Sequence, residues 1–278
     1  MRIVTYRSDR GARAGLLRNG AVVDIWNALG GRGSGVRDLL ESGRLADVAE
    51  LGEARVTPLE VVELLPPVPD PQKIVCIGLN YKAHAAEAGI EPPQAPTFFA
   101  KFANALAGPG ATIPLPRASR RVDFEAEVAL VIGRRCANVA AEDAADFVAG
   151  YMLLNDLSAR DLQFATPQWM PGKVFDGSAP CGPSLVTTEE ALADGPISFS
   201  LTLNGERMQS ATTYDLIFSV PELVSNLSSL MTLEPGDIVS TGTPSGVGST
   251  RDPAVWLAEG DELVISSPTL GLLETRIG

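Results

Sequence analysis

Acidic side chains gather on one short segment with the pattern of a β-strand. Asp123, Glu125 and Glu127 alternate with apolar residues across positions 122–132, which we predict to be one long strand. Side chains alternate between the faces of a strand, so the three acids share a face at a spacing of roughly 7 Å. Two glutamates so placed can converge on one cation, although the same pattern also occurs on solvated strand faces. The apolar residues at 130–132 occupy both faces and favour burial.

A third carboxylate ends the next predicted strand. The apolar segment 149–155 is followed directly by Asp156, which could close a turn or bind a ligand. Three carboxylates without a neighbouring histidine or cysteine would form an all-oxygen site, which suits Mg²⁺, Mn²⁺ or Ca²⁺ better than zinc. The chain has one histidine, which excludes zinc sites built from two or three histidines.

The single histidine has an acidic neighbour at helical spacing. His84 and Glu87 lie three residues apart in segment 81–88, which we predict to be a short helix begun by Asn80. A carboxylate beside an imidazole orients the ring and makes it a stronger base. The same pair could also be an exposed ion pair on a helix surface.

Two further segments could bind anions. Lys173 lies in a long loop, 159–182, that is rich in proline and glycine, and it could bind an anionic substrate or stabilise an enolate. Lys101 is the other lysine that stands out in a lysine-poor chain. The glycine run 241–248 follows a predicted strand but matches neither a P-loop nor a dinucleotide-binding motif. Its backbone N–H groups could bind a carboxylate, and a plain turn is an equal alternative.

The elements around these residues divide the chain into two parts. Residues 1–68 are predicted to form a small β-rich domain with a hairpin turn at Asn19-Gly20. Four prolines in the seven residues 65–71 indicate a linker, and residues 69–278 form the main domain. Many hairpins and few helices predict an α+β architecture that is mostly β, rather than a doubly wound α/β sheet.

The composition excludes several kinds of partner. Lysine and arginine total 22 against 34 aspartates and glutamates, and the net charge of −12 disfavours nucleic acid and anionic membranes. No apolar run reaches the roughly 18 residues that a membrane span needs, and the N-terminus lacks a signal-peptide core. Three cysteines without a CxxC pair fit a reducing compartment, so we expect a cytoplasmic protein. Cys181 is expected to be a small core residue rather than a reactive thiol.

Five motifs occur in an order that resembles the fumarylacetoacetate hydrolase family, over roughly residues 70–277. No single motif is specific, but five in sequence over this span are. In chain order, the five motifs are Gly78-Leu79-Asn80-Tyr81 with His84 and Glu87; Asp123-Phe124-Glu125-Ala126-Glu127; Asn155-Asp156 with Arg160-Asp161-Leu162-Gln163; Gly172-Lys173 with Phe175-Asp176; and Gly242-Thr243-Pro244 with Gly246-Val247-Gly248.

The resemblance implies the mixed β-roll of that family with a small N-terminal domain attached, and a homodimer. It also implies a divalent cation, Mg²⁺ or Mn²⁺, and a small anionic keto acid as substrate. The functional residues that it implies are Glu125, Glu127 and Asp156 for the metal, His84, Glu87 and Lys173 for catalysis, and Tyr81, Arg160, Gln163 and Thr243 for substrate binding.

Three kinds of function are compatible with this resemblance. The first is hydrolysis of a C–C bond in a 2,4-dioxo acid such as an acylpyruvate or fumarylpyruvate, with a pyruvate enolate as the leaving group. Oxaloacetate decarboxylation and enol–keto isomerisation are alternatives within the same family, and decarboxylation passes through the same enolate. A repurposed biosynthetic or ligand-binding member is the third, but the presence of both His84 and Glu87 argues against it.

Overall fold

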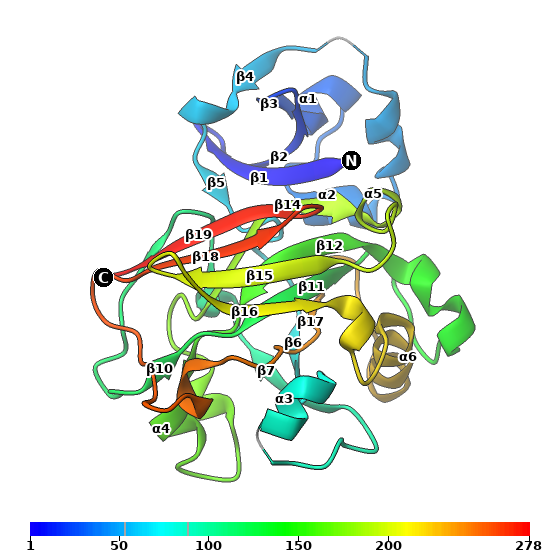
Figure 1. Ribbon diagram of the computed structural model, residues 1–278. Coiled ribbons are helices and arrows are strands. Elements are labelled where there is room, and N and C mark those ends of the chain that lie inside the picture. Colours follow the sequence, from blue (N-terminus) through cyan, green and yellow to red (C-terminus); the bar gives the residue numbers. More distant parts are fainter. Residues whose placement is uncertain (53, 88) are drawn as a thin grey trace.

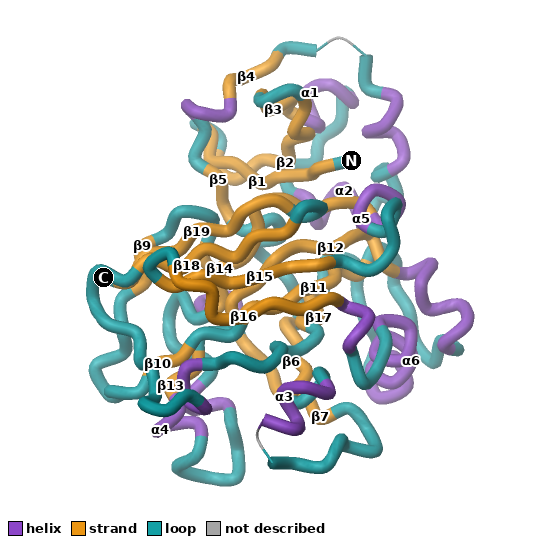
Figure 2. The backbone as a smooth tube through the Cα atoms, viewed as in Figure 1, coloured by secondary structure: helices purple, strands orange, loops and turns teal. Residues whose placement is uncertain are grey.

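The computed structural model describes residues 1–52, 54–87 and 89–278. Strands dominate, and they form a twelve-stranded sheet, a five-stranded sheet and a two-stranded ladder (Figures 1 and 2). The predicted α+β architecture with mostly β content is confirmed. Among the described residues, the structure has no helix that is both long and apolar enough to cross a membrane.

The large sheet extends from the N-terminal part of the chain into the main body. Its principal path contains, in spatial order, β4 (Val56–Pro58), β3 (Ala21–Asp24), β2 (Gly11–Arg18), β1 (Arg2–Ser8), β14 (Ala179–Thr187), β12 (Val148–Asn155), β11 (Ala126–Ile132), β17 (Ile238–Ser240), β6 (Ile74–Gly78) and β7 (Thr97–Lys101). Two short strands pair off this path, β5 (Leu64–Leu65) with β1 and β8 (Leu106–Ala107) with β14.

The small sheet covers one face of the large sheet (Figure 1). It contains, in spatial order, β16 (Glu206–Thr212), β15 (Ser198–Leu203), β18 (Glu262–Ser267), β19 (Gly271–Ile277) and β9 (Thr112–Ile113). Apolar side chains from both sheets, such as Leu130 and Ile265, form the first core between them. Helix α6 (Val220–Leu230) adds Leu223 and Leu227 to this core.

The opposite face of the large sheet packs against the N-terminal helices in a second core. Helices α1 (Ile25–Leu29) and α2 (Val36–Glu41) contribute apolar side chains to it, and the short 3₁₀ turn η1 (Ala46–Glu50) contributes Val48. Strand β11 serves both cores, because Leu130 faces the first and Ala129 and Val131 face the second. Both faces of this strand are therefore buried, as its apolar end predicted.

The N-terminal part is joined to the main body by more than a linker. The Asn19-Gly20 turn is confirmed, with both residues at positive φ (50° and 73°) between paired strands. Within the proline-rich stretch, Pro67 and Val68 are buried, and the Thr5 hydroxyl donates to the Pro67 carbonyl at 2.7 Å. Strand β1 also pairs with β14 in the main body. The domain boundary at residue 68 stays a prediction.

The predicted strand over 122–132 is interrupted. The structure has β10 (Val122–Asp123) and β11, separated at Phe124 and Glu125, and β10 pairs with β13 (Ser158–Ala159). The backbone N–H groups at the break bond to side chains instead of a neighbouring strand. Phe124 donates to its neighbour Asp123 at 2.8 Å, and Glu125 donates to the Asn155 side chain at 3.0 Å. The prediction of one continuous strand was therefore wrong at this point.

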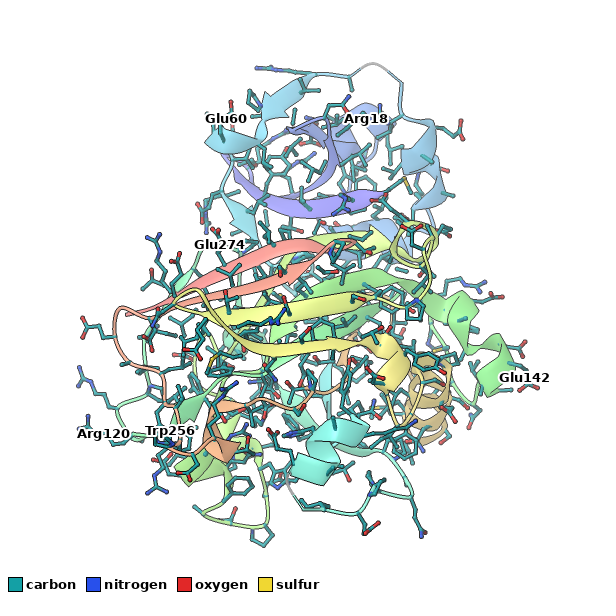
Figure 3. All side chains as sticks on the ribbon, in the orientation of Figure 1. Arg18, Glu60, Arg120, Glu142, Trp256 and Glu274 are labelled. Carbon is teal, nitrogen blue, oxygen red and sulfur yellow. The ribbon has the colours of Figure 1, made fainter. Side chains whose placement is uncertain are left out.

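The remaining helical segments are short. They are α3 (Lys82–Glu87), α4 (Arg160–Gln163) and α5 (Thr188–Ala191), with 3₁₀ turns η2 (Leu59–Val61), η3 (Ala103–Ala105), η4 (Ala141–Phe147), η5 (Met170–Gly172), η6 (Thr213–Asp215) and η7 (Gly248–Thr250). Figure 3 shows side chains filling the space between the elements, with Arg120, Glu142 and Trp256 at the periphery.

Helix α3 confirms most of the predicted helix over 81–88, whose last residue lies outside the described part of the chain. Asn80 does not cap it, contrary to the prediction. The Asn80 amide instead donates to the carbonyl groups of Phe218 and Thr241, at 3.1 and 2.9 Å. Its carbonyl oxygen accepts from the Phe218 N–H at 2.8 Å. Asn80 therefore ties the start of α3 to two distant loops.

Candidate metal and substrate site

The three predicted metal ligands meet at one end of the strand pair β11–β12. Glu127 lies on β11, Glu125 in the interruption before it, and Asp156 directly after β12. The Asp156 N–H donates to the Glu125 carbonyl at 2.9 Å, which fixes the two loops together. One carboxylate oxygen from each residue lies within 4.8 Å of the others. All three side chains are buried, so the alternative of a solvated strand face is excluded.

Three buried cationic side chains neutralise most of this acidic cluster. The Lys173 ammonium lies 2.7 Å from Glu125 Oε2 and 2.8 Å from Asp156 Oδ2. Lys101 lies 2.8 Å from the other Asp156 oxygen. The Arg160 guanidinium lies 2.7 Å from Glu125 Oε1, and it also contacts Asp123. The fold thus places Lys173 and Arg160 beside the acidic cluster, in the site that the resemblance implied for them.

Glu127 differs from its neighbours because no ion pair reaches it within the described part of the chain. It accepts hydrogen bonds from the Ser240 hydroxyl and, at 3.0 Å, from the Gly242 N–H. Burial, together with the negative charges of Asp156 and Glu125, raises the pKa of Glu127 well above its usual value. Burial acts the same way on Glu125, but the charges of Lys173 and Arg160 outweigh it and lower its pKa to about 2.

The cluster fits a divalent cation. Four buried acidic groups, counting Asp123, face three cationic side chains, so the cluster has one acidic group more than it has cations, and ionising that group would leave an unpaired buried charge. A buried charge is costly unless it is paired or coordinates a metal. The available donors are carboxylate oxygens, which suit Mg²⁺ or Mn²⁺. Glu125, Glu127 and Asp156 are the residues that would hold the ion.

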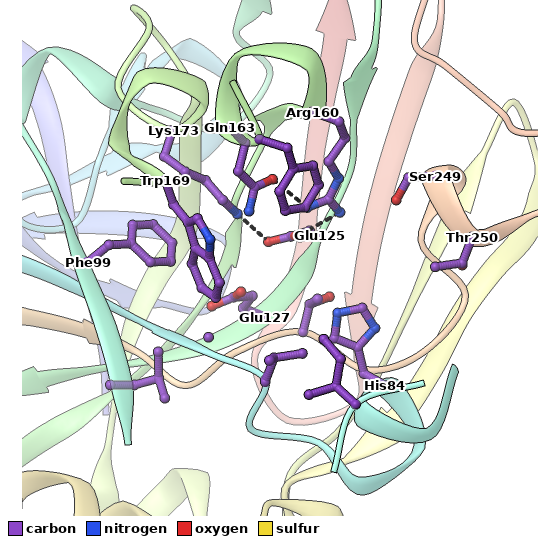
Figure 4. Close-up of a pocket in the computed structure, with 16 residues that line it drawn as sticks. His84, Phe99, Glu125, Glu127, Arg160, Gln163, Trp169, Lys173, Ser249 and Thr250 are labelled. Atoms are coloured by element: carbon purple, nitrogen blue, oxygen red, sulfur yellow. Dashed lines mark hydrogen bonds and ion pairs between the residues drawn. The ribbon is translucent and has the colours of Figure 1, made fainter. Parts of the chain in front are cut away.

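A cavity of about 280 Å³ opens onto the acidic cluster (Figure 4). Seven predicted site residues line it: His84, Glu125, Glu127, Arg160, Gln163, Lys173 and Thr243. Tyr81 does not. It is buried in the first core, where its ring packs edge to face on Phe199 at 6.2 Å. The predicted contact between Tyr81 and a substrate is therefore not supported by this geometry.

His84 borders the cavity, and Glu87 pairs with it. The His84 Nδ1 atom lies 3.2 Å from Glu87 Oε2, and the other carboxylate oxygen of Glu87 accepts from the Gly246 N–H at 3.0 Å. The His84 side chain is 13% exposed and that of Glu87 24%, so the pair is partly covered. Since Nδ1 faces Glu87, the other ring nitrogen remains available to a ligand.

The glycine run at 241–248 binds carboxylates of the protein itself. Its N–H groups donate to Glu127 from Gly242, to Glu87 from Gly246 and to Asp123 from Gly248, the last at 2.7 Å. Both Gly242 and Gly246 have φ near +100°, a conformation that favours glycine. The run therefore does bind carboxylates, as suggested, but these are side chains of the protein itself.

Two residues of the site had no assigned role at the start. Lys101 is buried, and its ammonium group also donates to the Lys173 carbonyl and, at 2.9 Å, to the Ser178 hydroxyl. Asp123 receives the N–H groups of the glycine run and the Arg160 guanidinium, so it joins two walls of the site. The scarcity of lysine and the acidic triplet were the available signals for these residues.

Comparison with known proteins decides the family. Residues 73–278 match the model described as "Fumarylacetoacetate (FAA) hydrolase C-terminal". The chain belongs to the fumarylacetoacetate hydrolase family. It is 42% identical to "Oxaloacetate tautomerase FAHD2B, mitochondrial" of Bos taurus, over 80% of this chain and 71% of the relative.

Solved structures of similar proteins confirm the fold of the family. The crystal structure of a protein from Mycobacterium smegmatis has a TM-score of 0.91 at 37% identity, covering 100% of this chain and 99% of its own. Maleylpyruvate hydrolase from Sphingobium sp. SYK-6, in complex with manganese (II) and pyruvate, has a TM-score of 0.81 at 31% identity, covering 100% and 98%. The members of this family that carry activity names are enzymes acting on small keto acids.

Proposed function

We propose that this protein interconverts the enol and keto forms of oxaloacetate or a closely related short 2-oxo dicarboxylate. One observation carries the proposal: His84, oriented by Glu87, borders the same small cavity as Glu125, Glu127 and Lys173. The identity of about 40% to relatives named oxaloacetate tautomerases supports it. A cavity of about 280 Å³ lies at the lower end of the range for ligand pockets and suits a small acid.

The acidic cluster would hold the metal. Glu125, Glu127 and Asp156 are the donors, and a bound divalent cation would supply Lewis-acid polarisation of the 2-oxo group. The manganese complex of the similar maleylpyruvate hydrolase supports a metal in this family. Either Mg²⁺ or Mn²⁺ is compatible with an all-oxygen donor set.

His84 is the proposed base and acid. Its Nδ1 side is oriented by Glu87, so in the keto-to-enol direction the opposite nitrogen takes a proton from the carbon beside the 2-oxo group, and the enolate oxygen takes a proton from solvent water to give the enol. The same nitrogen returns the proton in the reverse direction. The Gly246 N–H fixes the far oxygen of Glu87, so the imidazole is held by a chain of contacts that reaches the backbone.

Cationic groups on the opposite side of the cavity would stabilise the enolate. Lys173 and Arg160 are buried and charged, and both pKa values are raised because the neighbouring carboxylates outweigh the effect of burial. Preorganised positive charge beside a developing oxyanion lowers the barrier. Gln163 and Thr243 also line the cavity and stay predicted substrate contacts.

Hydrolysis of a C–C bond is the second candidate. His84 could instead take a proton from water, and the similarity to maleylpyruvate hydrolase supports this reaction. Oxaloacetate decarboxylation would use the same cationic wall and would need no activated water. These reactions share an enolate or enol. Tautomerisation and hydrolysis differ in what His84 deprotonates, and decarboxylation needs no proton transfer to His84.

Product assays separate the candidates. Metal-loaded protein is given enol-oxaloacetate, an acylpyruvate and fumarylpyruvate, with Mg²⁺ and with Mn²⁺ in turn. We expect the fastest reaction to be ketonisation of oxaloacetate, and we expect H84Q to slow it by about 10²–10⁴-fold while decarboxylation is retained. Faster release of pyruvate from an acylpyruvate would instead select the hydrolase. Ketonisation at the rate of the uncatalysed reaction would contradict the proposal.

A homodimer and a cytoplasmic location are proposed as well. The dimer rests on the family resemblance, and light scattering of the purified protein would test it. The location rests on the unpaired, buried cysteines, which suit a reducing compartment, and cell fractionation would test it.

A further inference from the structure

One wall of the cavity is formed by a tryptophan that rests directly on a glycine. The Trp169 indole lies against Gly78, the last residue of β6, and a Cβ atom added there would lie 3.0 Å from Cη2 and closer still to Cζ3. Gly78 is absent from the glycines with positive φ, so its backbone conformation does not require glycine. Glycine is needed here because a side chain at position 78 would collide with the Trp169 indole.

The indole is also held from its other sides. Phe99 packs edge to face on it, with ring centroids 6.0 Å apart at 67°. The Trp169 carbonyl accepts from the Gly172 N–H at 3.0 Å, within the turn that leads to Lys173. Lys173 in turn lies 4.9 Å above the Phe99 ring. Trp169 therefore cannot move freely without disturbing a cationic residue of the site.

This aromatic wall limits the length of the cavity. Figure 4 shows Trp169 beside Phe99 on one side of the acidic cluster, and Ser249 and Thr250 on the other. The described cavity between them measures about 280 Å³. An acid whose 2-oxo carboxylate faces a cation held by Glu125 and Glu127 would have little room for a long substituent beside the indole.

We propose that Trp169, seated on Gly78 and supported by Phe99, sets the upper size of the substrate and excludes 2-oxo acids with bulky apolar substituents. The inference rests on the proposed function, because it takes the ligand to be a 2-oxo acid. It adds a specificity residue to that site and a substrate class, the short dicarboxylates. A difference of one methylene group in an apolar pocket is worth about 10–200-fold in discrimination, so a whole ring can account for strong selection.

The test compares two ligands on four proteins. Wild type, W169L, G78A and the double variant G78A/W169L are titrated calorimetrically, with Mg²⁺ present, against oxaloacetate and a long-chain acylpyruvate. W169L is expected to raise the affinity for the long acid relative to oxaloacetate by at least about tenfold. W256L is the matched control, because Trp256 does not line the cavity, and we expect it to leave the ratio unchanged.

The Gly78 variants test the contact itself. G78A is expected to weaken oxaloacetate binding when Trp169 is present, because the new methyl group displaces the indole, and to have little effect in the W169L background. The proposed size limit would be overturned if G78A changed oxaloacetate binding equally with and without Trp169. It would also be overturned if W169L left the ratio of the two affinities unchanged.

A failure of the proposed function can be distinguished from a failure of the proposed size limit. Wild type that binds oxaloacetate but does not ketonise it would contradict the reaction, and the affinity ratios would still decide on Trp169. If neither acid binds wild type, both proposals are overturned.

Discussion

Two ionic clusters in this protein, one partly buried and one fully buried, are built from similar side chains and differ in their balance of charge. In the N-terminal part, Arg13 makes two bonds to Asp24, at 2.7 and 2.6 Å, and the Tyr6 hydroxyl adds a third at 2.8 Å. The Asn27 N–H completes the set. Arg10 lies 3.8 Å from the same carboxylate, so two cations face one anion, and the carboxylate has donors on both oxygens.

The metal-site cluster has more anions than cations. Glu127 has no ion pair within the described chain, its neighbours Glu125 and Asp156 share the available lysines, and a cavity borders the group. The difference shows in the pKa values. Hydrogen bonds from Arg13 overcome the effect of burial and lower the pKa of Asp24, whereas burial raises that of Glu127. Both clusters border a cavity, so the difference between them is the balance of charge. At Asp24 the cations are already in place, whereas the surplus of acidic groups around Glu127 marks a place for a cation.

Removing a cation from the unbalanced cluster should have the largest effect. K101M would deprive Asp156 of one partner and leave the polar groups around the lysine without a donor. Breaking a buried ion pair costs about 3–5 kcal/mol, so we expect a loss of that size in the free energy of unfolding. Chemical denaturation measures it, with K82M at an exposed lysine as control. Equal stability of the two variants would show that Lys101 is not needed to balance the cluster.

Removing the unpaired anion should have the opposite effect on stability. E127Q is expected to lower the affinity for Mn²⁺ by more than about 100-fold, beyond the usual effect of residues around the ligands. The pKa of Glu127 is raised in the folded state, so its contribution to stability is lost as the pH rises through that pKa. Metal-free E127Q should therefore be at least as stable as metal-free wild type at neutral pH.

Calorimetric titration and thermal unfolding test these two effects, with E142Q at the surface as the matched control (Figure 3). An unchanged Mn²⁺ affinity in E127Q would show that Glu127 does not bind the metal. A metal-free variant that unfolds more easily than wild type would show that Glu127 is already paired, as Asp24 is.

The balanced cluster should respond to pH in the reverse sense. The pKa of Asp24 is lowered, so its contribution to stability is present above the unfolded value of 3.8 and is lost as the pH falls through the folded value. D24N should cost about 1–3 kcal/mol at neutral pH, with the difference shrinking below about pH 4. Urea unfolding across that range checks this. D9N, at an exposed aspartate, should show no such trend.

The smallest effect is expected at a buried thiol. Cys181 is buried in β14, and burial raises the pKa of its thiol to about 12. Only the thiolate is reactive, so alkylation at pH 8 should leave Cys181 unmodified in the native protein and modify it after denaturation. Mass spectrometry distinguishes the two. Rapid labelling of the native protein would show that the Cys181 thiol is accessible and reactive, contrary to this prediction.

Sequence patterns predicted well those elements that local chemistry specifies. Strand β12 ends where the predicted strand 149–155 ends and begins one residue earlier, and the Asn19-Gly20 hairpin follows from two residues that tolerate positive φ. The acidic face at Glu125 and Glu127 was also visible, because strand alternation depends only on the order of residues. The motif order then selected Asp156 and Lys173.

Long-range contacts set the features that were not predicted. The interruption at Phe124 and Glu125 depends on Asn155, which lies on another strand. Strand β14 begins with proline and glycine at 180–183, and its partners β8, β12 and β1 come from elsewhere in the chain. The burial of Lys101 depends on Asp156 and Ser178, and nothing near it in the sequence indicates either partner.

The pairing of β1 with β14 has a consequence for how the chain is made. Arg2 lies opposite Val186, so the first strand to leave the ribosome gains this partner only after about two thirds of the chain has been synthesised. Pairings of such long sequence separation form slowly, and until then the edge of β1 that later pairs with β14 is open to association with other chains. Folding of the newly made protein should therefore depend on chaperones more than its final stability would suggest.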